Sequence, residues 1–130
     1  MRALLFLVAI GLAQTTATAV AAAERSLAIK SGETLELGQI YFQSNCRSIL
    51  KGPPTAEILD GPPELSVSVK EMQVNARLQK CPKPLPGGIL SLTAKDITKV
   101  SVNKAIVRIK YSTQDGDRYR SEILNVTMVP

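Results

Sequence analysis

Two Gly-Pro-Pro triplets divide the middle of this chain, and they constrain its fold more than any other feature. Residues 52–54 and 61–63 each place a glycine before two prolines. Proline fixes the backbone angle φ and has no N–H to donate, so neither triplet can lie inside a β-ladder. The segment 55–59 between them is therefore predicted to be one short strand, bounded by a sharp corner on each side.

Short runs with alternating apolar residues occur on both sides of these corners, and turn residues separate them. The clearest runs are 65–70, 89–94, 105–111 and 122–128, and shorter ones lie at 27–29, 35–37 and 39–42. Residues 71–79 fit either a continued strand or a short helical turn. An Asp115-Gly116 pair between the last two runs is a strong signal for a β-hairpin.

These runs predict an all-β protein. About seven to eight short strands, with turn signals at intervals of about 8–12 residues, are typical of a sandwich of two sheets. The sequence favours a single antiparallel, immunoglobulin-like domain over residues 24–130. Residues 82–88, which combine three prolines with two glycines, are predicted to be an extended loop that is stiff at first and then flexible.

Residues 1–23 have the layout of a secretory signal peptide. Met1 and Arg2 give a positive start, an apolar run fills 3–13, and small residues lead to Ala23. The apolar run is only about half of the roughly 20 residues that a membrane span requires. Cleavage after Ala23 is predicted to leave a bacterial periplasmic or secreted protein with no transmembrane span.

Cys46 and Cys81 are the two cysteines of the chain. Two cysteines in a small exported domain usually pair, and closing the loop between them gives about 3.5–4 kcal/mol in the chain-entropy treatment. A redox role is disfavoured, because the spacing is far from C-x-x-C and no histidine is present to activate a thiolate. The spacing is shorter than in antibody domains, so we expect the bond to join an early strand to the start of the 82–88 loop.

The composition argues against several functional classes. The chain has no histidine, which removes the commonest general base, the commonest zinc ligand and the Ser-His and Cys-His nucleophile pairs. A net charge of +5 and only five Tyr and Phe residues with no Trp do not fit a nucleic-acid binder. The chain is therefore expected not to be an enzyme, and no catalytic residue, metal ligand or cofactor is predicted.

A basic, proline-rich strip is the first candidate binding surface. Arg77, Lys80 and Lys83 surround Cys81, and Leu85 lies among the prolines that hold the strip extended. A loop that is stiffened by prolines and anchored by a disulfide loses little entropy on meeting a partner. Residues 77–88 are thus the predicted binding loop, with an unknown protein or envelope polymer as the partner. A plain connection between sheets is the alternative.

The end of the predicted hairpin is the second candidate surface, where Arg118, Tyr119 and Arg120 follow the acidic pair Asp115 and Asp117. A tyrosine between two arginines suits a contact site, and a solvated hairpin end is the alternative.

For the 77–88 loop, a second functional hypothesis is inhibition of a secreted protease by a substrate-like segment.

Four stretches resemble a group of short, exported, single-domain immunoglobulin-like β proteins of alphaproteobacteria. They are Asn-Cys-Arg-Ser-Ile-Leu at 45–50, Leu-Asp-Gly-Pro-Pro at 59–63, Cys81 with Pro-Gly-Gly at 86–88, and Tyr-Ser-Thr-Gln-Asp-Gly-Asp-Arg-Tyr-Arg at 111–120. The resemblance implies a β-sandwich in the periplasm or outside the cell. It implies no functional residues.

Overall fold

The computed structural model describes residues 23–76 and 79–130, so the predicted signal peptide lies almost wholly outside the described residues. Within them lie nine strands: β1 (Ala23–Lys30), β2 (Thr34–Ile40), β3 (Gln43–Ser44), β4 (Arg47–Ser48), β5 (Thr55–Asp60), β6 (Leu65–Val74), β7 (Leu85–Ala94), β8 (Ser101–Thr113) and β9 (Gly116–Val129). The prediction of an all-β sandwich is confirmed. β5 lies between the two Gly-Pro-Pro corners, as their chemistry predicts.

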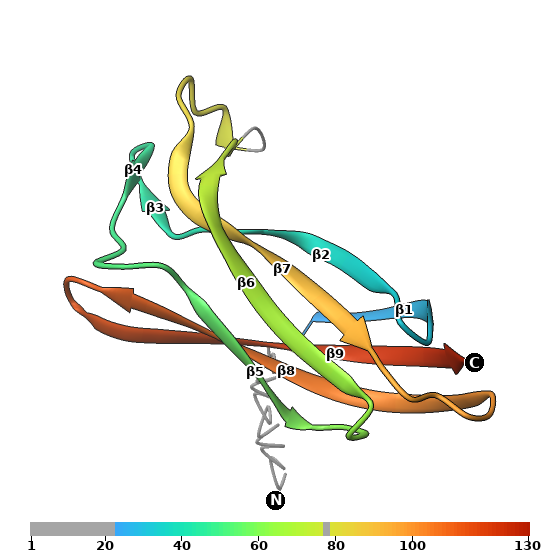
Figure 1. Cartoon of the computed structure of the whole chain (residues 1–130). Helices are drawn as coiled ribbons and strands as arrows, with labels where there is room; N and C mark the ends of the chain where they lie inside the picture. Colours follow the sequence, from blue (N-terminus) through green and yellow to red (C-terminus); the bar gives the residue numbers. More distant parts are fainter. Residues whose placement is uncertain (1–22, 77–78) are drawn as a thin grey trace, which may run out of the picture.

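Two sheets and a small hairpin make up the described fold. One sheet has the strand order β1-β9-β8-β5, the other has the order β2-β7-β6, and β3 pairs only with β4. Figure 1 shows the three-stranded sheet lying over the four-stranded one. The segment that precedes β7 and the β3–β4 hairpin lie at one end of the molecule, and the β7–β8 connection lies at the other.

The core lies between the sheets and follows from the two-residue period of the strands. Along β8, Ala105, Val107 and Ile109 are fully buried, and the two residues between them are half-buried. Leu90 and Leu92 of β7 face them from the second sheet and belong to the same apolar cluster. The two sheets therefore share one continuous core, which positions the loops at both ends.

One strand pairing differs from the wholly antiparallel arrangement that the sequence predicts. β1 pairs in parallel with β9, from Ala23 opposite Glu122 to Lys30 opposite Val129. The chain then turns at 31–33 and crosses to the other sheet, where β2 pairs with β7. The partners of a parallel pair are distant in sequence, so no local pattern of β1 or β9 could reveal the pairing.

The hairpin predicted around Asp115-Gly116 is confirmed. β8 and β9 pair along their whole length, and the ladder closes with Thr113 opposite Gly116. Gly116 has a φ of 108°, a backbone conformation that L side chains rarely adopt. The buried Thr113 hydroxyl donates a hydrogen bond of 2.6 Å to the Gly116 carbonyl. Local turn chemistry therefore fixes the register of the longest strand pair in the described fold.

The prediction of a loop over 82–88 is wrong for its second half. β7 begins at Leu85, and residues 85–88 pair with residues 71–74 of β6. Pro86 is tolerated there because the ladder between β7 and β2 ends at Gly88, opposite Ile40, so Pro86 has a neighbouring strand on one side only. The two glycines after it are buried, and they serve close packing rather than flexibility.

A methyl group at Gly87 is expected to destabilise the fold. Its Cβ would lie 2.5 Å from the carbonyl oxygen of Ile40 and 3.0 Å from a methyl of Val74. A main-chain oxygen cannot move aside as a flexible side chain can, so Gly87→Ala should lower the free energy of unfolding by about 1–3 kcal/mol. Urea denaturation measures this. Gly52→Ala is the matched control, because its added Cβ meets no atom within 4 Å, and an equal effect of both variants would contradict the packing argument.

Candidate functional site

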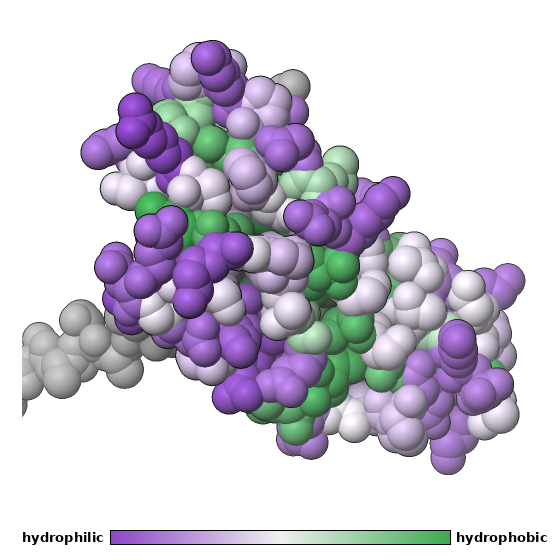
Figure 2. All heavy atoms as spheres, turned by 60° about the vertical axis from the view of Figure 1, so that its left-hand side comes forward, coloured by the Kyte–Doolittle hydropathy of each residue, from purple (hydrophilic) through white to green (hydrophobic). Residues whose placement is uncertain are grey.

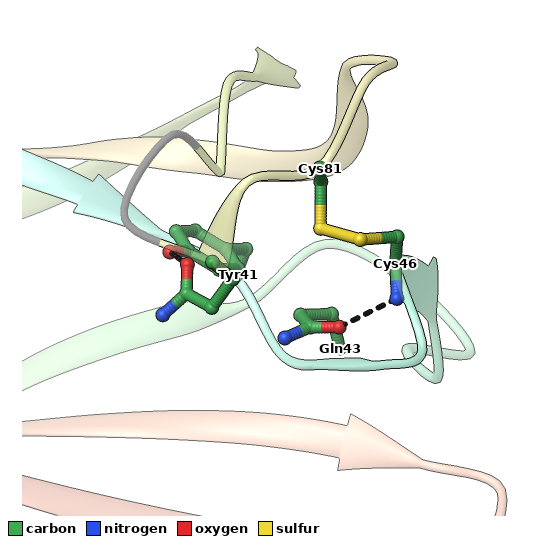
Figure 3. Close-up of a disulfide and its surroundings, with 5 residues drawn as sticks. Tyr41, Gln43, Cys46 and Cys81 are labelled. Carbon is green, nitrogen blue, oxygen red and sulfur yellow. Dashed lines mark hydrogen bonds between the residues drawn. A yellow bond between two sulfur atoms is a disulfide. The ribbon is translucent and has the colours of Figure 1, made fainter.

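The predicted disulfide between Cys46 and Cys81 is confirmed, with their Cα atoms 5.3 Å apart. Cys46 lies in the turn between β3 and β4, and Cys81 lies in the segment before β7. Figure 3 shows the bond joining these two segments, with Gln43 next to Cys46. The bond therefore ties two loops at one end of the sandwich and does not pass through the core, in place of the strand-to-loop connection that the sequence predicts.

Strained backbone flanks both halves of the disulfide. Asn45 and Cys46, the two central residues of the β3–β4 turn, have φ values of 51° and 59°, and Lys80 has a φ of 56°. Two positive φ values are what a type I′ hairpin turn requires, and asparagine accepts them more readily than most residues. The side-chain oxygen of Gln43 accepts a hydrogen bond of 2.8 Å from the Cys46 N–H. The hydrogen bond from Cys46 to Gln43 and the disulfide therefore both fix the position of Cys46.

A cleft of about 600 Å³ opens at this end of the molecule. Its walls come from the end of β2, the segment after β6, and the facing strands β8 and β9, so both sheets contribute. Among the described residues, those that line it are Gln39, Ile40, Tyr41, Asn75, Gln79, Tyr111 and Arg120. In the view of Figure 2, the upper part of the molecule, where the loops lie, is largely hydrophilic.

The two tyrosines of the cleft are held in place by their neighbours. The Tyr41 hydroxyl donates a hydrogen bond to the side-chain oxygen of Gln79, two residues before Cys81. The Tyr111 ring packs against Phe42, with ring centroids 5.4 Å apart, and Tyr111 is only 3% exposed. Burial raises the pKa of Tyr111 above its ordinary value of 10.0; nearby Arg120 opposes this shift. Tyr111 is therefore a neutral phenol at physiological pH.

The second candidate surface is divided between two faces of β9. Arg120 lies opposite Ile109, on the face that turns toward the core, and it lines the cleft. Tyr119 lies opposite Lys110 on the other face, where the Arg108 guanidinium carbon is 4.9 Å from its ring centroid. Successive residues of a strand point to opposite faces, so Arg118, which lies opposite Tyr111, shares the face of Arg120, and Tyr119 does not belong to the same surface.

Only part of the first candidate surface, residues 77–88, is exposed to solvent. Lys80 and Lys83 are exposed in the segment before β7, as the sequence predicts. Leu85 is 5% exposed and contributes its side chain to the interior at the start of β7, so it cannot meet a partner there. Arg77 lies outside the described residues. The exposed strip is therefore shorter than 77–88.

The structure brings together residues that the two predictions treat as separate. Gln79 from the first segment and Arg120 from the second line the same cleft. The amides of Gln39 and Asn75 and the phenol of Tyr41 carry no functional signal in the sequence, because each lies in or beside an ordinary strand pattern. Only the convergence of two sheets makes them neighbours, so no signal local to their positions could have identified them.

The described side chains that line this cleft are mostly polar. Its lining side chains donate and accept hydrogen bonds and carry one positive charge, and none of those described is a carboxylate or a thiol. Across residues 23–76 and 79–130, no group of three or more metal-ligating side chains is close enough to hold an ion. The same residues contain no helix of the length and apolarity needed to cross a membrane.

Comparison with protein-family models, curated proteins and solved structures found no match. The paired cysteines fit an extracellular or periplasmic protein, since disulfides persist in oxidising compartments.

Proposed function

We propose that this chain is an exported, non-enzymatic binding module of the periplasm or the extracellular space. In this proposal the disulfide end of the sandwich contacts the partner, which is a protein or an envelope polymer. The signal-like residues 1–23 and the paired cysteines support export. The resemblance to exported alphaproteobacterial proteins is part of the same proposal.

The strand order supports an immunoglobulin-like arrangement. Immunoglobulin domains place their second, fourth and fifth strands in one sheet and their third, sixth and seventh in the other. If β2 is taken as the second strand, then β5 is the third, and β6, β7, β8 and β9 follow in order. The two sheets β2-β7-β6 and β9-β8-β5 then reproduce that division, with β1 added beside the last strand.

The single observation that carries the proposal is the cleft beside the disulfide. Gln79 and Arg120 both line it, and the exposed Lys80 and Lys83 lie within four residues after Gln79 in the chain. Loops that a rigid scaffold positions are common places for binding sites. This one is fixed by a disulfide and by a side-chain hydrogen bond, so little conformational entropy is lost when a partner binds.

Charge reversal beside the cleft is expected to weaken binding. The oxidised protein, immobilised and exposed to a cell-envelope extract, should retain its partner, and Lys80→Glu/Lys83→Glu should lower retention by about tenfold or more. The cause is repulsion between the new carboxylates and the acidic groups that the wild-type lysines attract. Quantitative elution profiles of the retained material measure the difference.

The matched control is Lys95→Glu/Lys99→Glu. These two lysines are also exposed, and they lie in the β7–β8 connection at the opposite end of the molecule (Figure 1). This control changes the net charge by the same amount, so it should retain the partner as the wild type does. Equal loss in both variants would show that only net charge matters, and retention by both would place the binding surface elsewhere.

The protease-inhibitor hypothesis remains a prediction, and the geometry gives it less support. A substrate-like inhibitor presents an extended, exposed segment to the protease. Here the exposed run that follows Cys81 covers only Pro82, Lys83 and Pro84, because Leu85 is already a buried strand residue. The two prolines also lack the N–H groups that pair with a protease in such complexes. Inhibition assays against proteases of each catalytic class would decide it.

A further inference from the structure

The side chains of the cleft indicate what class of ligand it fits. Gln39, Asn75 and Gln79 present amides and Tyr41 presents a phenol, while Tyr111 is only 3% exposed beneath them. An amide or a hydroxyl can both donate and accept hydrogen bonds, so these groups match a ligand whose own groups also do both. A sugar, with a hydroxyl on nearly every carbon, is such a ligand.

The charge of the cleft restricts that ligand further. Arg120 is the one charged residue among the described residues that line it, and it is exposed. The ion pairs found between described residues join Arg25 to Glu122, Arg108 to Glu57 and Lys110 to Asp117, so Arg120 belongs to none of them. A guanidinium binds a carboxylate through two parallel hydrogen bonds, and it remains charged at any physiological pH.

The cleft is formed before any ligand arrives. The hydrogen bond from Tyr41 fixes the Gln79 side chain, the disulfide anchors the segment that follows it, and Phe42 supports the buried Tyr111 ring. Its volume of about 600 Å³ lies within the range of about 300–1,000 Å³ that is usual for small-molecule sites. It therefore has room for a short oligosaccharide but not for a folded protein.

We propose that this cleft binds a carbohydrate that carries carboxylate groups, such as a short run of uronic acid residues. The amides and the Tyr41 phenol would bind the hydroxyls, and Arg120 would bind one carboxylate. The exposed Lys80 and Lys83, outside the cleft, would attract the acidic residues that follow in a longer chain. This inference rests on the proposed binding function and names the ligand class of the same site.

A peptide ligand fits the cleft less well. Peptides commonly bind by adding a strand to a free sheet edge or by placing apolar anchors in pockets. Acidic peptide motifs are recognised by clusters of arginines, whereas Arg120 is the one arginine among the described residues of the cleft. The one aliphatic residue among those lining the cleft is Ile40, which is 2% exposed and belongs to the core. Among the described residues the cleft therefore offers no exposed aliphatic side chain to an apolar anchor, whereas its polar groups suit a ligand rich in hydroxyls.

Isothermal titration of the oxidised protein with trigalacturonate tests the inference. We expect saturable binding, at least tenfold tighter than binding of the neutral galactose trimer. Arg120→Gln keeps hydrogen-bond donors but removes the charge, and it should weaken binding of trigalacturonate by about 10- to 100-fold. Lys104→Gln is the matched control, since Lys104 is exposed on β8 opposite Asn125, far along the ladder from Arg120, and does not line the cleft. It should change the affinity by less than about twofold.

Several results would overturn the inference. If the neutral galactose trimer bound as tightly as trigalacturonate, Arg120 would have no role in recognition. If inorganic sulfate at the same concentration displaced trigalacturonate, the cleft would recognise charge alone. Equally tight binding of an oligoglutamate peptide, with the same dependence on Arg120, would replace carbohydrate by peptide. Absence of trigalacturonate binding would overturn it as well. If Lys80 and Lys83 still governed retention of an envelope partner in that case, the proposed function would stand without this ligand.

Discussion

Replacing both cysteines is expected to lower the free energy of unfolding by about 4 kcal/mol. The bond between Cys46 and Cys81 closes a long loop, and removing it restores the entropy of that loop to the unfolded chain. Such a loss is a large share of the roughly 5–15 kcal/mol that stabilises a typical domain. Urea denaturation of Cys46→Ser/Cys81→Ser beside the oxidised wild type measures it, with both cysteines changed so that no free thiol remains.

The wild type reduced with dithiothreitol is the matched control for that variant. It lacks the bond but keeps both side chains, so its unfolding midpoint should approach that of the double variant. Because the disulfide lies outside the core, both forms should still fold and keep the β-sheet signal in circular dichroism. A loss below about 1 kcal/mol would show that the two loops are held together without the bond.

Leu92→Ala is expected to lower the free energy of unfolding by about 3–4 kcal/mol. Leu92 is 0% exposed in the middle of β7, where it pairs with Leu35 of β2 and Val67 of β6. Truncation there removes buried methyl groups and leaves a cavity that neighbours on two strands cannot readily fill. Chemical denaturation followed by circular dichroism gives the value.

Leu59→Ala provides the comparison, because Leu59 is the same residue type on β5 and is 49% exposed. Its truncation should change the free energy of unfolding by less than about 0.5 kcal/mol. Comparable losses at the two positions would mean that the core does not lie between the two sheets as described.

Those parts of the fold that depend on local chemistry could be predicted from the sequence. The Asp115-Gly116 hairpin and the strand between the two Gly-Pro-Pro corners both follow from residues that fix or free φ. The start of β7 could not be predicted. Its Pro86-Gly87-Gly88 segment has the composition of a turn, and only the packing against Ile40 and Val74 shows why glycine is needed in a strand.

The site could be predicted only in fragments. Exposed lysines beside Cys81 follow from the sequence, because charge and proline keep such a segment at the surface. That Arg120, rather than Tyr119, belongs with them depends on which face of β9 each residue occupies. The cleft itself depends on how two sheets approach each other, and a single sequence holds no measure of that distance.

The parallel pairing of β1 with β9 has a consequence for the order of folding. β1 is the first described strand of the chain and β9 is the last, so their ladder links segments about as distant in sequence as the domain allows. Contacts of that kind slow folding, because a long loop must close before they form. A chain emerging N-terminus first cannot complete its four-stranded sheet until its final residues are available, and β1 must remain unpaired with β9 until then.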